Sequence, residues 1–435
     1  MATSQETDAA SSRPLNRRDV KVLSLSALGG ALEFYDFIIF VYFATVVGQL
    51  FFPPEMPEWL RQIQTFGIFA AGYLARPLGG IIMAHFGDLL GRKKMFTLSI
   101  FLMAVPTLLI GMMPTYDTLG YAAPLLLVAL RILQGAAVGG EVPGAWVFVT
   151  EHVKRRHVGF ACGTLSAGLV SGILIGSLMS AFIKSTYSDA ELAAYAWRIP
   201  FLIGGVFGLI AVYLRRWLHE TPVFAEMQEK KALAEELPVK SVLCNHLPSV
   251  LLSMGVTWIL TAAVVVVILM TPSLLQSRYG LDASLANVYA ILGVVVGSLA
   301  SGWCADRIGS GPTIAFWGVL LAITYWAMMT TVGTHPEWLT PLYILCGFAV
   351  GIVGVVPTIA VKSFPAMVRF TGLSFSYNVA YAIFGGFTPI VVSVMMVVHP
   401  MFPAIYVAAL GGLGIVIGLY LMRAQSGRRL AIMAS

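Results

Sequence analysis

Long apolar segments separated by short polar connections run through almost the whole sequence. A helix needs about 20 apolar residues to cross the hydrocarbon core of a bilayer. The sequence contains segments of this kind at residues 22–50, 63–86, 95–113, 122–149, 158–183, 198–218, 243–275, 282–304, 313–333, 340–361, 372–397 and 402–422. We therefore predict an all-α polytopic membrane protein with twelve transmembrane helices.

The composition agrees with this pattern. Of the 435 residues, 58% are hydrophobic and 11% are charged, whereas an ordinary soluble domain has about 25% charged residues. A soluble chain of this length could not bury so much apolar surface. The cysteines lie far apart and have no metal-ligand spacing, so we expect neither a disulfide framework nor a metal site.

A charged segment at 215–240, RRWLHETPVFAEMQEKKALAEELPVK, interrupts the apolar pattern in the middle of the chain. It reads as a linker between two groups of six helices. The predicted organisation is a tail at 1–21, a six-helix bundle at 22–218, a linker at 219–242, a second six-helix bundle at 243–422 and a tail at 423–435.

The basic residues of the loops predict the orientation. Of the 27 Lys and Arg, 21 fall in the tails, the linker and the loops of one side, and four fall in the loops of the other side. Because basic loops stay in the cytoplasm, we expect both tails to lie on the cytoplasmic side of a cytoplasmic (inner) membrane. This topology accounts for the net charge of +6 without a nucleic-acid partner.

Two short motifs recur at nearly the same offset. GDLLGRKK at 87–94 corresponds to ADRIGSGP at 305–312, so that Asp88 and Asp306 are 218 positions apart, and RHVG at 156–159 corresponds to RFTG at 369–372. Each copy follows an even-numbered span. The sequence therefore predicts two homologous, pseudo-symmetric halves. In transporters with this architecture the substrate site lies between the halves.

The motifs themselves resemble a known family. GDLLGRKK is similar to the loop motif of the major facilitator superfamily. Further segments together resemble its metabolite:proton symporter branch, which carries citrate, α-ketoglutarate, shikimate and proline/betaine: LEFYDF at 32–37, RPLGG at 76–80, RILQGAAVGGE at 131–141, WRIPF at 197–201 and VRFTGLSFSYN at 368–378. The loop motif departs from the family pattern at Ala84 and Leu89, and the second copy lacks the basic cluster. The resemblance implies the major facilitator fold and an asymmetric gate.

Five ionisable residues lie inside predicted spans, where a charge costs roughly 2.5–3.5 kcal/mol on insertion scales. The spacing i, i+3 places Glu33 and Asp36 on one face of the first span, and repulsion between them favours a proton on at least one carboxyl group. We predict a role in proton coupling for Glu33, Asp36, Arg131 and Glu141. A structural alternative is that these side chains form ion pairs that fix the helix packing.

Candidate substrate contacts occur in both halves. Arg76 lies inside the second span, about three turns from its cytoplasmic end, and a guanidinium there can bind a carboxylate with two hydrogen bonds; a resident acid of the first span is the alternative partner. In the second half Tyr377 and Tyr381 share a helix face, while the aromatic residues Trp258 and Tyr325 are weaker candidates. The predicted set is Arg76, Tyr35, Arg131, Gln134, Tyr377, Asn378 and Tyr381.

The resemblance also implies a gate at the loop motif. Asp88 can cap a neighbouring helix or pair with a basic residue of the other bundle, and Arg92 can reach Glu141 or Glu151. A purely topological role of the basic loop remains an alternative for Lys93 and Lys94. The predicted gating residues are Gly87, Asp88, Gly91, Arg92 and Asp306.

Together these features predict a proton-coupled symporter that imports a small organic acid by rocker-switch alternating access. Two buried arginines and the similarity to citrate-type carriers favour a di- or tricarboxylate. The alternatives are a zwitterionic metabolite or osmolyte of the betaine type, and an uncoupled facilitator or exchanger. An enzyme is disfavoured because the sequence has no phosphate-binding loop and no zinc-ligand motif. The expected partners are the anionic substrate, protons and membrane lipid; we expect no cofactor and a functional monomer.

Overall fold

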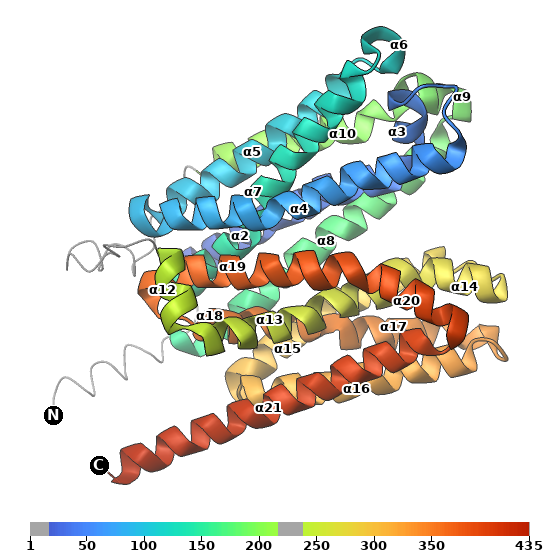
Figure 1. Cartoon of the computed structure of the whole chain (residues 1–435). Helices are drawn as coiled ribbons and strands as arrows, with labels where there is room; N and C mark the ends of the chain where they lie inside the picture. Colours follow the sequence, from blue (N-terminus) through green and yellow to red (C-terminus); the bar gives the residue numbers. More distant parts are fainter. Residues whose placement is uncertain (1–16, 216–237, 435) are drawn as a thin grey trace.

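The computed structural model describes residues 17–215 and 238–434, which form helices and short connections (Figure 1). Long helices make up a first bundle: α2 (Arg17–Tyr42), α3 (Ala44–Phe51), α4 (Glu58–Leu90), α5 (Arg92–Met112), α7 (Ala122–His152), α8 (Val158–Thr186) and α10 (Arg198–Arg215). Short helices close its connections: α6 (Tyr116–Leu119), η1 (Arg155–His157), α9 (Asp189–Glu191) and η2 (Leu192–Ala196).

The second bundle contains more interrupted helices. It consists of α12 (Pro238–Asn245), α13 (Leu247–Ala262), η3 (Ala263–Met270), α14 (Thr271–Tyr279), α15 (Ser284–Arg307), α16 (Ser310–Thr331), η4 (Pro336–Trp338), α17 (Leu339–Val350), η5 (Gly351–Gly354), α18 (Val356–Lys362), η6 (Ala366–Val368), α19 (Arg369–Ala380), η7 (Tyr381–Gly385), α20 (Gly386–Val398) and α21 (Phe402–Ala434). The π-helical segments η3 and η7 each lie within a longer helix.

The all-α membrane class is confirmed. Eleven helices of the described part are long and apolar enough to cross a membrane, and α4, with 33 residues, completes the twelve-helix architecture. Side chains such as Leu74 and Leu78 of α4 are exposed on the outside of the bundle, where a membrane protein contacts lipid. Most of the predicted linker at 219–242 and most of the tail at 1–21 lie outside the described residues.

Glycine turns end the second helix of each half. Gly91 joins α4 to α5 with φ of 115°, and Gly309 joins α15 to α16 with φ of 96°. Side chains disfavour this backbone region, and glycine adopts it without steric cost. The two glycines occupy the same position in the two copies of the loop motif, so the repeated sequence forms the same turn in both halves.

Small residues bring helices of the two bundles into close contact. A Cβ atom on Gly163 of α8 would lie 2.5 Å from the carbonyl oxygen of Ser298 on α15, and one on Gly302 would lie 3.0 Å from the Cα atom of Gly163. Small residues at helix crossings allow such close backbone approach in membranes. Gly159 and Gly163 of α8 therefore serve the contact between the bundles, whereas Gly168 and Gly172 pack against α2 of the same bundle.

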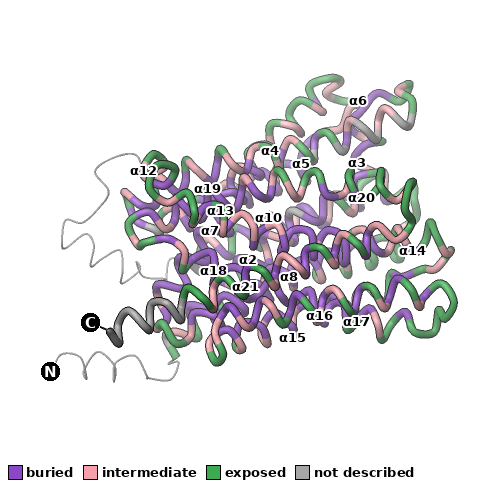
Figure 2. Tube along the Cα trace, turned by 60° about the horizontal axis from the view of Figure 1, so that its bottom comes forward, coloured by how far each residue is buried: buried purple, intermediate pink, exposed green. Residues whose placement is uncertain are grey.

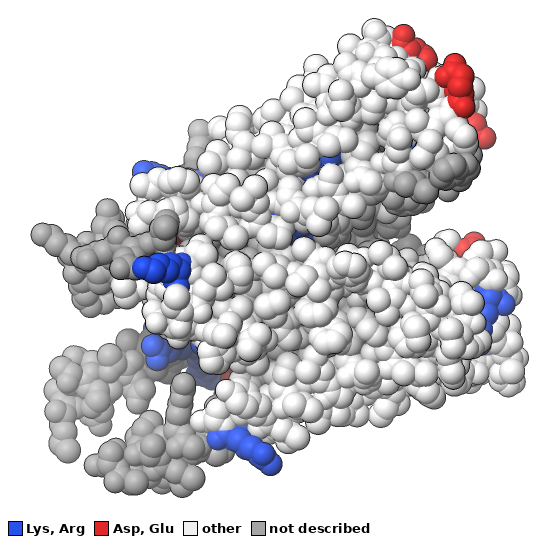
Figure 3. Space-filling view, in the orientation of Figure 1, with Lys and Arg blue, Asp and Glu red and all other residues white. Residues whose placement is uncertain are grey.

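The bundles meet at one end and separate at the other. We call the end at which α2 begins and α21 ends the tail side (Figure 1). Figure 2 shows buried residues concentrated in the middle of the molecule and exposed residues at its ends. In the space-filling view the bundles are in contact toward the tail side, and a cleft opens between them at the opposite side (Figure 3).

Candidate functional site

The five ionisable residues predicted within spans are all buried, with exposed fractions of 2% or less. Three of them, Asp36, Arg76 and Arg131, belong to two groups of interacting side chains. We call Asp36, Thr107, Arg131 and Gln134 the Asp36 cluster. We call Tyr73, Arg76, Tyr377, Asn378 and Tyr381 the Arg76 cluster.

A chain of hydrogen bonds runs through the Asp36 cluster. The Thr107 hydroxyl lies 3.2 Å from Oδ2 of Asp36 and receives a hydrogen bond of 2.6 Å from Nε2 of Gln134. Oε1 of Gln134 in turn accepts a hydrogen bond of 2.9 Å from Nη1 of Arg131. The chain joins α2 to α7 through α5, so two neutral side chains link an acid to a base.

The Asp36 carboxyl group lies against a glycine surface of α10. A Cβ atom on Gly204 would collide with Oδ1 of Asp36, and one on Gly208 would lie 3.9 Å from Oδ2. Oδ1 is buried and has no hydrogen-bond partner among the described residues. One carboxyl oxygen thus has a donor and the other has none, an arrangement that suits a group carrying a proton for part of the time.

Tyr35 and Arg131 are held by contacts within the first bundle. The Tyr35 hydroxyl donates a hydrogen bond of 3.0 Å to the carbonyl oxygen of Pro200, which ties α2 to α10. The Arg131 guanidinium lies 4.2 Å from the centre of the Phe40 ring, at cation–π distance. The structure therefore gives Tyr35, predicted as a substrate contact, a position in helix packing.

Aromatic rings surround the Arg76 guanidinium. Its centre lies 4.3 Å from the ring centre of Tyr381, 5.5 Å from that of Tyr73 and 5.7 Å from that of Tyr377. Tyr73 and Tyr381 are stacked with ring centres 6.1 Å apart, and Trp146 packs edge-on against Tyr377 at 5.1 Å. Residues from both bundles therefore enclose one buried cation.

Asn378 connects Arg76 to the second bundle. Its Oδ1 atom accepts a hydrogen bond of 3.4 Å from Nε of Arg76, and its Nδ2 atom donates one of 2.7 Å to the carbonyl oxygen of Gly139 on α7. Ser374 also donates to that carbonyl, at 3.2 Å. Nη2 of Arg76 is buried and lacks a hydrogen-bond partner of good geometry among the described residues. The Tyr377 hydroxyl interacts with the same guanidinium.

Glu33 and Tyr73 interact electrostatically with the arginines of the two clusters. Glu33 lies close enough to Arg76 and Tyr377 for an electrostatic interaction with both, while Asp36, three residues further along α2, belongs to the other cluster. Tyr73 is influenced by the charges of both Arg76 and Arg131. The face of α2 predicted from the i, i+3 spacing thus faces both groups.

Glu141 lies elsewhere in the first bundle. Its carboxylate is in short contact with the Ser99 hydroxyl of α5, and it follows Arg131 by ten residues along α7. At 1.5 Å per residue this is about 15 Å along the helix axis. Glu141 is therefore separate from the Asp36 cluster, although the sequence predicted both for proton coupling.

Two aspartates cap helices of the opposite bundle at the tail side. Oδ2 of Asp88, at the end of α4, accepts hydrogen bonds of 3.1 and 2.8 Å from the backbone N–H and the hydroxyl of Thr371 in the first turn of α19. Asp306 of α15 accepts two of 2.7 Å from the backbone N–H groups of Gly159 and Phe160 in the first turn of α8. A carboxylate there satisfies free N–H groups and interacts favourably with the helix dipole.

The Phe370 side chain closes the tail side between α4 and α7. It is 1% exposed. A Cβ atom on Gly87 would collide with its ring, and one on Gly144 would lie 2.9 Å from its Cζ atom. Gly87, predicted as a gating residue, therefore provides space for an aromatic side chain of the other bundle.

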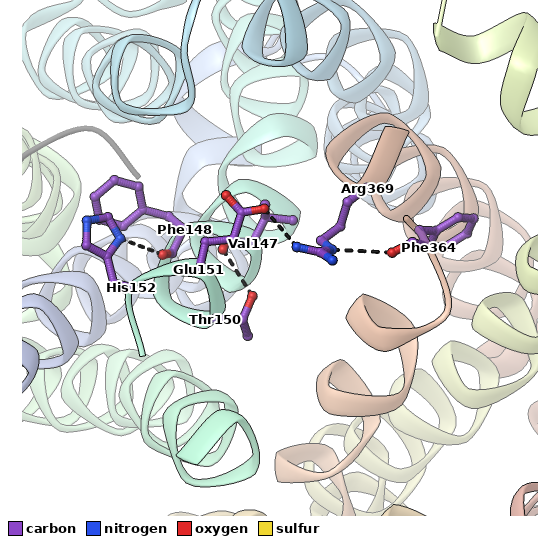
Figure 4. A network of polar contacts seen from close by, with 7 residues as sticks. All are labelled: Val147, Phe148, Thr150, Glu151, His152, Phe364 and Arg369. Carbon is purple, nitrogen blue, oxygen red and sulfur yellow. Dashed lines mark hydrogen bonds and ion pairs between the residues drawn. The ribbon is translucent and has the colours of Figure 1, made fainter. Parts of the chain in front are cut away.

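An ion pair adds to this closure (Figure 4). Nη1 of Arg369 on α19 lies 2.9 Å from Oε1 of Glu151 on α7, and Nε of Arg369 donates to the carbonyl oxygen of Phe364. The sequence suggested Arg92 as a partner for Glu151. The side chain of Arg92 lies outside what the structure describes, so this suggestion stays a prediction.

The two weaker aromatic candidates have positions in the packing of the second bundle. Nε1 of Trp258 donates a hydrogen bond of 2.8 Å to the Tyr406 hydroxyl, and its ring stacks on Phe384. The Tyr325 hydroxyl lies 3.0 Å from that of Thr271, and Tyr325 is completely buried. Both contacts hold helices of one bundle together.

Sequence analysis missed Thr107, Tyr73 and Phe370. Thr107 gave no signal, because a threonine in a transmembrane helix commonly bonds to its own backbone, as Thr107 does to Met103. Tyr73 precedes Arg76 by three residues, a spacing that places both on one helix face. In the part of the chain that the structure describes, no group of three or more His, Cys, Asp or Glu could hold a metal ion.

Two helical bundles around a central cleft, with a buried arginine between them, are typical of the class of secondary transporters. A family model described as Major Facilitator Superfamily matches residues 37–389. The chain belongs to the Major Facilitator Superfamily and is a multi-pass membrane transporter.

Known proteins agree with this assignment. A putative proline/betaine transporter of Staphylococcus aureus (strain COL) is 30% identical over 417 residues, which cover 94% of this chain and 90% of the relative. The proline/betaine transporter of Escherichia coli (strain K12) is 28% identical over 431 residues, covering 94% and 86%. The fold is similar to that of the proton:xylose symporter XylE, with a TM-score of 0.77, 15% identity and coverage of 93% and 95%. The predicted family resemblance is confirmed.

Proposed function

We propose that this protein is a proton-coupled symporter that imports a zwitterionic osmolyte of the proline/betaine type. The observation that carries the proposal is the Arg76 cluster, in which a buried guanidinium lies among three tyrosine rings contributed by both bundles. The names of the relatives support this alternative. The di- or tricarboxylate predicted from the sequence has no support from them.

The chemistry of the cluster fits a zwitterion. A single carboxylate can accept a charge-assisted hydrogen bond from Arg76. A quaternary or secondary ammonium group gains from the faces of nearby aromatic rings, and Glu33 lies close enough to the same region for an electrostatic interaction. A tricarboxylate would bring excess negative charge beside Glu33 with one guanidinium to compensate it. One anionic and one cationic group match the site better.

The proton is assigned to Asp36. Its buried carboxyl group is surrounded by side chains of the first bundle, and burial of an uncompensated charge is expensive in a membrane. Protonation removes that charge and lowers the cost of reorientation. Uptake is thereby coupled to inward proton flow.

Alternating access is proposed to follow from rocking of the two bundles. Residues of both bundles close the tail side through Asp88, Asp306, Phe370 and the pair of Glu151 with Arg369, and the cleft opens opposite (Figure 3). The excess of basic residues in the tail-side loops assigns that side to the cytoplasm. We propose an outward-facing monomer in the cytoplasmic membrane with both tails in the cytoplasm.

The experiment is uptake of labelled glycine betaine, L-proline and citrate by proteoliposomes that contain the purified protein. With an acidic exterior we expect accumulation of betaine or proline above the external concentration, and its loss on addition of a protonophore. Uptake of citrate alone would overturn the substrate assignment. Equilibration that is indifferent to the pH gradient would instead support the uncoupled facilitator.

A further inference from the structure

We propose that Thr107 is a positioning residue that transmits the protonation state of Asp36 to Arg131 through Gln134. This inference rests on the proposed proton coupling and extends it to a side chain to which the sequence assigned no role. The argument starts from the position of Thr107 on α5, between the acid of α2 and the polar pair of α7.

A hydroxyl group has one donor and two acceptor positions, and the surroundings of Thr107 use both kinds. Its oxygen accepts from Nε2 of Gln134 at 2.6 Å. Its single proton has two acceptors within reach, Oδ2 of Asp36 at 3.2 Å and the carbonyl oxygen of Met103 at 2.9 Å. The hydroxyl can therefore turn between two partners without leaving its place.

The choice between these partners depends on the proton of Asp36. When Asp36 is ionised, Thr107 donates to the carboxylate and accepts from Gln134. When Asp36 is protonated, its O–H donates to Thr107, and Thr107 turns its own proton to the carbonyl oxygen of Met103. Both states satisfy the hydroxyl, so Asp36 exchanges its proton without leaving Thr107 unsatisfied.

The change passes along the chain because hydrogen bonds polarise one another. Donation to a carboxylate makes the Thr107 oxygen a better acceptor for Gln134, which strengthens the bond from Arg131 to Oε1 of Gln134. Protonation of Asp36 weakens the same chain. Arg131 is then held less firmly.

Arg131 packs against α4, the helix that carries Arg76. A Cβ atom on Gly72 of α4 would lie 3.2 Å from the backbone oxygen and 4.0 Å from Nε of Arg131. The next residue, Tyr73, belongs to the Arg76 cluster and is influenced by the charge of Arg131. The chain therefore runs from the proton site to the element that carries Arg76.

The helices packed against Asp36 supply few other charged or titratable groups. α7 contributes Arg131, and α2 itself contributes Tyr35 and, on the same helix face as Asp36, Glu33. α10 presents Gly204 and Gly208, and α8 packs against α2 through Gly168 and Gly172. Thr107 is the hydrogen-bond donor to Asp36 that a substitution can remove without changing a charge.

The test compares Thr107→Val with Thr107→Ser. Valine keeps the shape of threonine and loses both hydrogen-bonding functions, whereas serine keeps them. The ionised form of Asp36 loses the stronger, charge-assisted bond, so Thr107→Val favours the protonated form. We expect the midpoint of Asp36 protonation to move to higher pH by roughly 0.5–1 unit, and Thr107→Ser to restore it.

Two readouts separate this inference from the proposed function. A pH titration by infrared difference spectroscopy follows the carboxylic C=O band that disappears in Asp36→Asn, and it needs no substrate. The second readout is the pH profile of glycine betaine or L-proline uptake. Thr97→Val is the matched control, because Thr97 on α5 makes the same bond to its own backbone, 2.9 Å to the carbonyl oxygen of Lys93.

The outcomes are distinct. An unchanged infrared midpoint in Thr107→Val, or an equal shift in Thr97→Val, overturns the inference even if wild-type uptake is proton-coupled. A shifted midpoint in Thr107→Val together with wild-type uptake that ignores the pH gradient refutes proton coupling and leaves the hydrogen-bond role of Thr107 intact. In an Asp36→Asn background, Thr107→Val is expected to leave the pH profile unchanged.

Discussion

The Asp36 cluster and the Arg76 cluster draw on different parts of the molecule. The Asp36 cluster takes its side chains from α2, α5 and α7 of the first bundle, whereas the Arg76 cluster joins α4 to α19 and η7 of the second. Rocking of rigid bundles preserves contacts within a bundle and breaks contacts between bundles. The first cluster can therefore keep its geometry through the cycle while Asp36 binds and releases a proton, and the second must re-form around the substrate.

Asp36→Asn tests the first half of this comparison and has the largest expected effect. An amide cannot carry the proton, so we expect complete loss of gradient-driven accumulation while exchange of substrate across the membrane persists. Accumulation assays and counterflow assays in proteoliposomes measure the two activities. Asp117→Asn, at an exposed position of α6, is the matched control. Accumulation by Asp36→Asn at the wild-type level would show that another group carries the proton.

Arg76→Ala tests the second half. Loss of one partner of a buried, hydrogen-bonded charge pair costs about 2 kcal/mol or more, which corresponds to a loss of affinity of about 30-fold or more. Isothermal titration calorimetry with glycine betaine or L-proline measures it. Arg423→Ala, at an exposed position of α21, should bind like the wild type. Retention of wild-type affinity by Arg76→Ala would place the substrate outside this cluster.

The variants Asp88→Ala and Asp306→Ala test whether contacts between the bundles control the opening of the tail side. Each removes a helix cap that joins the bundles at the tail side, worth about 0.5–2 kcal/mol, so the ratio of open to closed tail side should rise by about 2- to 30-fold. Pulsed electron–electron double resonance measures the opening as the distance between spin labels at Lys94 and Met367, which are both exposed. An unchanged distance distribution in both variants would argue against a gating role.

Glu151→Gln has the smallest expected effect. Glu151 is 1% exposed and Arg369 is 21% exposed; in Glu151→Gln the amide oxygen still accepts a hydrogen bond from Arg369, whose guanidinium reaches solvent, so the expected loss is about 1 kcal/mol or less. The same spin-label pair should report an increase in the open population of about fivefold or less. The exchanged pair Glu151→Arg with Arg369→Glu should return toward the wild-type distribution. If the exchange is no better than the single variant, the charge pair is not what holds α7 to α19.

The helices were predictable because a membrane leaves few choices. Each backbone polar group in the bilayer must be paired within its own helix, so length and hydropathy define the elements. The span predicted at 122–149 is α7 (Ala122–His152), and that at 158–183 is α8 (Val158–Thr186). The final span was predicted to end at 422, whereas α21 continues to Ala434, because a helix can extend through polar sequence beyond the membrane.

The candidate site was predictable where charged or polar side chains are rare in the apolar spans and where their spacing places them on one helix face. Buried arginines stand out in an apolar sequence, and Tyr377, Asn378 and Tyr381 were selected with Arg76 before the structure brought them together. The contacts of Thr107 and Phe370 depend on how each helix is rotated and on which helix of the other half it meets. Neither quantity is contained in the hydropathy of a single span.

The most direct test of the account is the movement of protons with substrate. Proteoliposomes containing a pH-sensitive dye are given glycine betaine or L-proline at equal internal and external pH, for the wild type and for Asp36→Asn. The account predicts acidification of the interior by the wild type and none by Asp36→Asn, although the variant still exchanges substrate. Substrate entry into wild-type vesicles without any acidification would contradict it.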